Sequence, residues 1–192
     1  VFRAAGEKLG GDAKAASDAF TSGIKAQGEF IEAASKMAKP DQGEVMKMLA
    51  KTSEFMGVAD GLADKRGAHS QHCKMVNDAC QVFPWVLEAS KPTPVVAENA
   101  GAATFTANKI MTANKGTDEA QVDFAKAQIA VLKALTVYVK ANHTTGLAWN
   151  SAGGAAPAAA AASSSGDEAF EDVLAANETF RAAGEKLGGD AK

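Results

Sequence analysis

Long apolar runs are missing from the sequence. No apolar stretch approaches the roughly 18 residues that a membrane-spanning helix needs, so we expect no membrane partner. Cysteine is scarce as well, since the chain contains only Cys73 and Cys80. If both lie on one helix, about 10 Å separates them, which is too far for a disulfide. We therefore expect two free thiols and a reducing, cytoplasmic compartment.

Charge of one sign is also lacking. The net charge is −3, and the basic residues are scattered among acidic ones instead of forming a basic stripe. A nucleic-acid partner would need such a stripe, so we expect none. Hydrophobic residues make up 46% of the chain and charged residues 22%, which is typical of a soluble globular protein.

The motifs of common catalytic and cofactor sites are missing too: there is no nucleophile elbow, phosphate-binding glycine loop, HExxH helix or calcium loop. Four possible metal ligands lie close together in the sequence: His69, His72, Cys73 and Cys80. A structural zinc site normally takes its ligands from two separate segments, which favours partly buried thiols and surface histidines instead. His143 has no recognisable carboxylate partner and is interpreted as a helix-end residue. We expect a non-enzymatic protein without cofactor or metal.

What is present is a helix-forming composition rich in Ala, Lys, Glu, Gln and Met. Apolar residues recur at spacings of three and four, which predicts an all-helical chain. The predicted helices span residues 12–39, 44–66, 70–81, 95–114 and 119–142. Gly67 is expected to end the second helix in a left-handed conformation. The prolines within residues 91–94 are expected to keep that segment extended.

The segment FRAAGEKLGGDAK occurs twice, at residues 2–14 and again at residues 180–192. A window cut from a tandem array and a permutation both explain this repeat. Between the copies, an Ala/Gly/Ser-rich stretch indicates a flexible linker, followed by a predicted helix that carries Phe170, Val173 and Leu174. The sequence thus predicts a bundle domain at residues 1–150, a linker at 151–167, and the first helix of a second copy at 168–192.

The first copy begins partway through its helix, and residues 1–9 are predicted to be too short for a stable helix. The C-terminal helix, at about residues 168–187, is therefore expected to supply or duplicate the first helix, in its own chain or by exchange with a neighbour. A flexible linker of this length reaches roughly 20–24 Å, which is sufficient. The predicted fold is an all-α, six-helix antiparallel up-and-down bundle, whose even helix number brings its start and its finish to one end.

The loops carry a resemblance to a known family. The segments that carry it are ADKRG at residues 63–67, KPTPVV at 91–96, AATFTANKIM at 102–111 and HTTGLAW at 143–149. AFEDVL with FRAAGEKLGGDAK, and AFTSGIKAQGEFIEAASKMAKP, resemble the first two helices of the same domain. Together they resemble the N-terminal helical domain of the cyclase-associated proteins, which are regulators of actin turnover.

The resemblance implies a six-helix bundle that binds actin, particularly cofilin-decorated filaments, and speeds their depolymerisation. The residues it marks as contact candidates are Lys65, Arg66, Lys91, Pro92, Thr144 and Thr145. Pro92 and Trp149 are interpreted equally well as residues that shape and anchor their loops, and Trp85 as a core anchor.

Two functions of different classes follow. The first is a cytoskeleton-associated, actin-regulatory module. The second is a structural or adaptor repeat in a large cytoskeletal assembly, in which linked weak sites act together.

Overall fold

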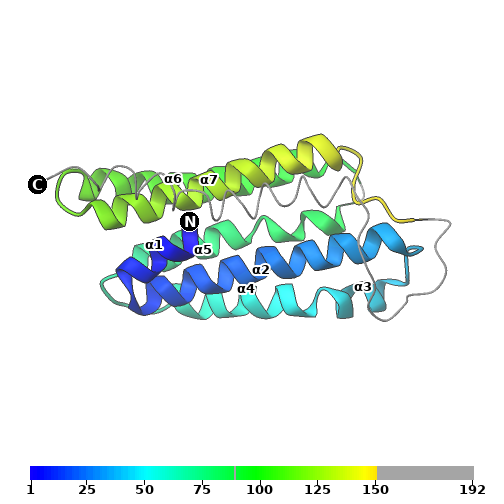
Figure 1. The fold of residues 1–192 in the computed structure, drawn as a ribbon, viewed down its shortest axis with the longest axis horizontal. Coiled ribbons are helices and arrows are strands. Elements are labelled where there is room, and N and C mark those ends of the chain that lie inside the picture. The colour runs from blue at the N-terminus through cyan, green and yellow to red at the C-terminus, as the bar shows by residue number, and fades with distance from the viewer. Residues whose placement is uncertain (89, 151–192) are drawn as a thin grey trace, which may run out of the picture.

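The computed structural model describes residues 1–88 and 90–150 of the chain, and every regular element in that part is a helix (Figure 1). The elements are α1 (Phe2–Leu9), α2 (Gly11–Lys36), α3 (Gln42–Met48), α4 (Ala50–Ala63), α5 (Ser70–Cys80), the 3-10 helix η1 (Phe83–Leu87), α6 (Pro92–Asn114) and α7 (Glu119–Asn142). The all-α prediction is confirmed. The predicted linker and C-terminal helix lie outside the described residues.

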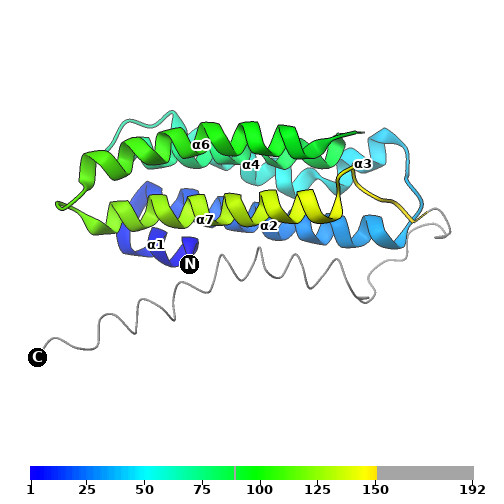
Figure 2. The same ribbon diagram turned by 90° about the horizontal axis from the view of Figure 1, so that it is seen from above.

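The helices form an antiparallel bundle. α1 packs between α2 and α7, α4 packs against α2 and α5, and α6 packs against α5 and α7. Figure 2 shows α6 and α7 running side by side from the turn that joins them. α3 and α4 together make one pass along the bundle, as do α5 and η1, whereas α1, with 8 residues, runs beside only part of the 26-residue α2.

The first helix differs from the prediction, because residues 2–9 are helical. Phe2 is fully buried, with its ring centroid 5.8 Å from that of Phe20 and 4.8 Å from that of Phe124. The expectation that this segment is too short for a stable helix is wrong, since most helical stability in proteins comes from packing against neighbours instead of from length. Gly10 and Gly11 have positive φ angles of 70° and 51° and make the turn into α2.

The predicted helix 44–66 is interrupted and ends early. Leu49, with φ −85° and ψ 0°, separates α3 from α4. Its backbone still makes two hydrogen bonds of the helical kind. The Leu49 N–H donates to the Val45 carbonyl at 3.1 Å, and the Ser53 N–H donates to the Leu49 carbonyl at 3.0 Å. The helix ends in a tight turn in which the Lys65 N–H donates to the Leu62 carbonyl at 3.2 Å. That turn satisfies the terminal carbonyl without a left-handed residue, so the cap predicted at Gly67 is wrong.

The segment predicted to be extended at residues 91–94 is also different. Pro92 is the first residue of α6, where its missing N–H costs nothing and its fixed φ angle already suits a helix. The restriction that a proline places on the residue before it falls on Lys91, which adopts the left-handed conformation at φ 56° and ψ 55°. A short left-handed step thus replaces the predicted extended connector.

Candidate partner-binding surfaces

The bundle has two ends, and α2 connects them. The Lys65 ammonium lies 3.2 Å from the Asp12 carboxylate at the start of α2, which defines the first end. The Asn150 N–H donates to the Met37 carbonyl at 3.0 Å, just past the last residue of α2, which defines the second end. Because α2 has 26 residues, the two ends are about 39 Å apart.

The six contact candidates do not form one surface. Lys65 and Arg66 follow α4 at the first end, whereas the remaining candidates lie at the second end, beside the start of α6 and the end of α7. The helices alternate in direction, so two successive connections necessarily lie at opposite ends. A partner that touches both groups has to extend along the bundle.

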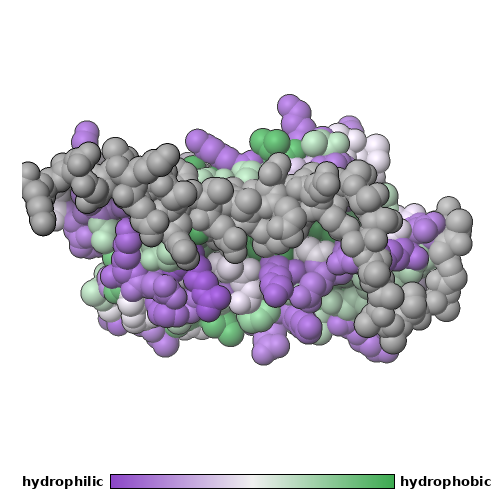
Figure 3. Space-filling model, viewed as in Figure 1, coloured by the Kyte–Doolittle hydropathy of each residue, from purple (hydrophilic) through white to green (hydrophobic). Residues whose placement is uncertain are grey.

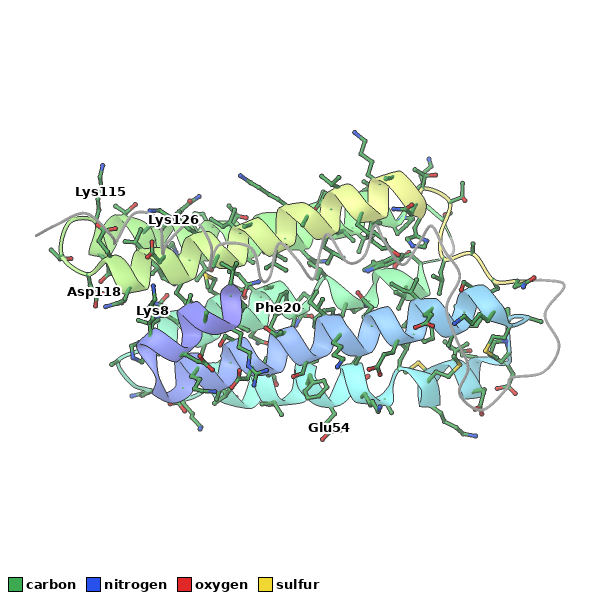
Figure 4. All side chains as sticks on the ribbon, viewed as in Figure 1. Lys8, Phe20, Glu54, Lys115, Asp118 and Lys126 are labelled. Carbon is green, nitrogen blue, oxygen red and sulfur yellow. The ribbon has the colours of Figure 1, made fainter. Side chains whose placement is uncertain are left out.

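The first end is polar and mixed in charge. Lys65 and Arg66 are exposed, and Figure 4 places Lys8, Lys115 and Asp118 at the same end. Lys65 is paired with Asp12, whereas the Arg66 guanidinium forms no ion pair within the described part of the chain. Solvent and salt weaken such exposed pairs, so the Lys65 ammonium remains available to a partner.

At the second end, a loop of residues 143–150 is held by aromatic contacts to the bundle. The His143 ring lies 4.9 Å from that of Trp85 and 5.2 Å from that of Tyr138, and its Nε2 is 3.0 Å from the Tyr138 hydroxyl. The Trp149 ring lies edge-on to Phe30 at 5.9 Å. These contacts fix both sides of the loop.

The loop presents Thr144 and Thr145, whose side chains are exposed between those anchors. Gly146, with φ 102°, turns the backbone back toward the bundle. Lys91 is exposed at the same end, but Pro92 is buried, so its ring supports the start of α6 and is not displayed to a partner. The expectation that Trp85 is a core residue is confirmed, because the side chain has no exposed area.

Sequence reasoning missed the exposed apolar side chains. The largest are Phe105 and Val137, at 63% and 68% exposure, with Leu87 in η1 at 50%. The Lys109 ammonium sits 4.2 Å from the centroid of the Phe105 ring. Their helical spacing alone does not separate them from core residues, because each sits beside a buried position. On the face in Figure 3, hydrophilic side chains are interspersed with small hydrophobic areas.

In the histidine and cysteine cluster, His72, Cys73 and Cys80 are buried and His69 is half-buried, and the group is poorly suited to chemistry. Burial, with a smaller contribution from the nearby His69, lowers the pKa of His72 to about 4. Burial raises the pKa of Cys73 and raises that of Cys80 to about 12. Both thiols are free, as expected, and a protonated buried thiol is a weak nucleophile. Within residues 1–88 and 90–150, no group of three His, Cys, Asp or Glu side chains is arranged to hold a metal ion.

His143 has the same character as His72. Burial lowers its pKa to about 4. The neutral ring therefore serves as a packing element between Trp85 and Tyr138.

None of the helices in the described part is long and apolar enough to cross a membrane.

These features define a class of protein: an antiparallel helical bundle whose candidate surfaces for partners are polar loops, one of them anchored by aromatic contacts. Comparison with known families is more specific. The model of the family described as "CAP, N-terminal domain" matches residues 1–147, and the chain belongs to this family. This match confirms the resemblance to the cyclase-associated proteins that the short sequence segments indicated.

Individual relatives agree. The chain is 32% identical over 149 residues to adenylyl cyclase-associated protein 1 from Homo sapiens, which covers 77% of this chain and 31% of the relative. It is 31% identical over 133 residues to adenylyl cyclase-associated protein from Dictyostelium discoideum, with 68% and 29% covered. The chain thus spans about a third of the length of the curated relatives it matches.

Solved structures share the fold. The N-terminal domain of the Dictyostelium discoideum protein superposes with a TM-score of 0.75 at 28% identity, covering 80% of this chain and 88% of that one. A second structure of a CAP N-terminal domain, described as indicating variable oligomerisation, gives a TM-score of 0.76 at 29% identity and covers 80% and 84%.

Proposed function

We propose that this chain is a non-enzymatic actin-cytoskeleton regulator domain that binds actin or cofilin-decorated actin filaments and promotes their turnover. The family match over residues 1–147 carries the proposal. The relatives are named for their association with an adenylyl cyclase, which supports a role in binding instead of in catalysis. In this role the chain works in the cytoplasm, on the cytoskeleton.

The second end is the stronger candidate for the filament contact. Thr144 and Thr145 stand on a loop that is fixed on one side by the buried His143 and on the other by the partly buried Trp149, and Lys91 supplies a positive charge beside it. A preorganised loop loses little conformational entropy on binding. Pro92 contributes by holding the start of α6 in place.

Lys65 and Arg66 form a separate contact candidate at the first end. Because about 39 Å lies between the ends, we propose that the two groups contact different parts of a filament. An exposed basic pair mainly accelerates association with an acidic surface, and its contribution falls as salt is added.

Co-sedimentation with actin filaments, with and without cofilin, tests the proposal. The combined variant Lys91→Ala, Thr144→Ala and Thr145→Ala is expected to weaken binding by about ten-fold or more. Lys65→Ala with Arg66→Ala is expected to weaken it mainly at low salt. Lys133→Ala, an exposed lysine in the middle of α7, is the matched control and should bind as the parent does.

A second function remains a candidate because the sequence repeats FRAAGEKLGGDAK at a domain-sized interval. A structural or adaptor repeat would bind weakly through each domain and gain strength from linkage. If the parent chain does not sediment with actin at saturating concentration, in either the presence or the absence of cofilin, the actin-regulatory proposal is wrong and the adaptor function takes its place.

A further inference from the structure

The position of α1 between α2 and α7 is a closely fitted slot. Phe2 is fully buried between Phe20 and Phe124. One turn further along α1, Gly6 lies so close to α2 that a Cβ atom there would be 1.9 Å from Ser17 Oγ and 2.8 Å from Ser17 Cβ. The slot therefore selects a phenylalanine and a glycine four residues apart on one helix.

The chain contains that occupant twice. Residues 180–187 repeat the α1 sequence FRAAGEKL without a change, so Phe180 and Gly184 stand where Phe2 and Gly6 stand in α1. A slot that accepts one copy offers the second copy the same contacts. We propose that residues 180–187 of the same chain occupy the α1 slot in exchange with residues 2–9, so that one bundle position has two interchangeable occupants.

The second copy brings additional apolar residues. Phe170, Val173 and Leu174 precede it at spacings of three and four, which place them on one side of a helix. α1 runs alongside only the first part of α2, and both α2 and α7 continue well past the start of α1 (Figures 1 and 2). A helix that continues upstream of Phe180 in the slot would lie along those parts of α2 and α7.

The chain can reach the slot without a partner molecule. The Asn150 N–H is bonded to the Met37 carbonyl, so the chain leaves the bundle at the second end. From there the level of Phe20, where Phe180 would sit, is about 25 Å along α2. The flexible stretch predicted from the composition of residues 151–167 would span roughly 20–24 Å, and a helix predicted from the sequence at residues 168–179 would add about 18 Å along the same direction. Tethering over such distances gives an effective concentration on the order of millimolar.

Thermal unfolding of the full chain and of three variants tests the exchange. Gly6→Leu blocks the first copy at Ser17, and Gly184→Leu blocks the second copy in the same way. Leucine favours a helix more than glycine does, so any loss of stability reports lost packing and not lost helix propensity. We expect each single variant to melt within about 2 °C of the parent, and the double variant to melt about 5–10 °C lower.

Gly57→Leu is the matched control. It introduces the same side chain in α4, where a Cβ atom would have no neighbour within 4 Å, and it should not lower the melting temperature. The proposal is wrong if Gly6→Leu alone lowers the melting temperature as far as the double variant does while Gly184→Leu has no effect. In that case only residues 2–9 ever occupy the slot.

Protein concentration separates occupation within one chain from exchange between chains. The Gly6→Leu variant is expected to remain monomeric by light scattering, with a melting temperature that is constant over a hundred-fold range of concentration. Oligomers, or a melting temperature that rises with concentration, would overturn the assignment to the same chain.

Discussion

Trp85 and Gln27, which are 58 residues apart in sequence, are joined by a buried hydrogen bond: the indole Nε1 donates to Gln27 Oε1 at 3.0 Å. The Gln27 Nε2 in turn donates to the Phe83 carbonyl at 2.7 Å. Neither Gln27 nor Trp85 has any exposed area. One amide side chain therefore links α2 to η1.

We expect Gln27→Leu to lower the free energy of unfolding by about 2–4 kcal/mol, because it leaves a buried indole N–H and a buried carbonyl without partners. The measurement is urea unfolding followed by tryptophan fluorescence. The matched control is Gln71→Leu on the exposed side of α5, which should change the free energy of unfolding by less than about 0.5 kcal/mol. Equal effects of the two substitutions would show that the buried link contributes nothing.

Stability should fall on mild acidification because of His72 and His143. Burial lowers the pKa of each to about 4, whereas the unfolded chain has the ordinary value of 6.5. The unfolded state therefore binds protons first, so stability is highest above pH 6.5 and falls as the pH drops toward 4. Each histidine contributes at most about 3 kcal/mol to this loss.

The measurement is urea unfolding at pH 7.5, 6, 5 and 4.5. His72→Phe removes one of the two groups and should make the dependence on pH shallower, whatever its effect on stability at pH 7.5. A free energy of unfolding that stays constant from pH 7.5 to 5 would contradict the expectation.

Lys91→Gly should separate folding from binding. Lys91 is the one non-glycine residue with a positive φ in the described part of the chain, and glycine adopts that conformation without the steric cost of a side chain. We expect Lys91→Gly to stabilise the bundle by about 0.5–1 kcal/mol, yet to weaken filament binding because the charge is lost. Lys91→Ala removes the same charge but retains the unfavourable conformation, so it should weaken binding without the gain in stability.

The two thiols should be protected from reagents in the folded protein. Cys73 and Cys80 are buried, and the raised pKa values keep both in the protonated form, which reacts slowly. Labelling with a thiol-specific chromophore at pH 8 should be slow in buffer and should reach two groups per chain in urea. Rapid labelling in buffer would show that α5 opens readily. Fewer than two groups in urea would show oxidation.

Much of the fold could be predicted because local signals determine it. The predicted helix 119–142 matches α7 to the residue. Its start is marked by Asp118, whose carboxylate accepts a hydrogen bond from the Ala120 N–H at 3.1 Å and a second from the Gln121 side chain at 2.8 Å. The apolar residues that follow show a period no strand would have.

The wrong predictions concern positions where two local rules compete or where contacts distant in the sequence decide the structure. A proline both restricts the residue before it and starts helices well, and only the structure shows that Lys91 adopts a left-handed conformation so that Pro92 can begin α6. The helicity of residues 2–9 depends on contacts with Phe20 and Phe124, which are distant in the sequence. Propensity within the segment carries no information about them.

For the candidate surfaces, residue types were easier to predict than their grouping. The polar sequences of the loops indicated exposed residues, and Lys65, Lys91 and Thr144 are exposed. Their separation into two ends follows from the alternating direction of helices, which the predicted up-and-down topology already contains. The burial of Pro92 could not be read in this way, because it depends on how the start of α6 packs on its neighbours.

The contact of Asn150 with the end of α2 has a mechanical consequence. Its N–H is bonded to the carbonyls of Ala34 and Met37 at 3.4 and 3.0 Å, and the neighbouring Trp149 ring rests on Phe30. A pull on the chain beyond Asn150 is therefore carried first by the last turns of α2, and α7 bears the load only after this clip has opened. These contacts of Trp149 and Asn150 with α2 therefore protect the end of α7 from force that is applied to the chain beyond Asn150.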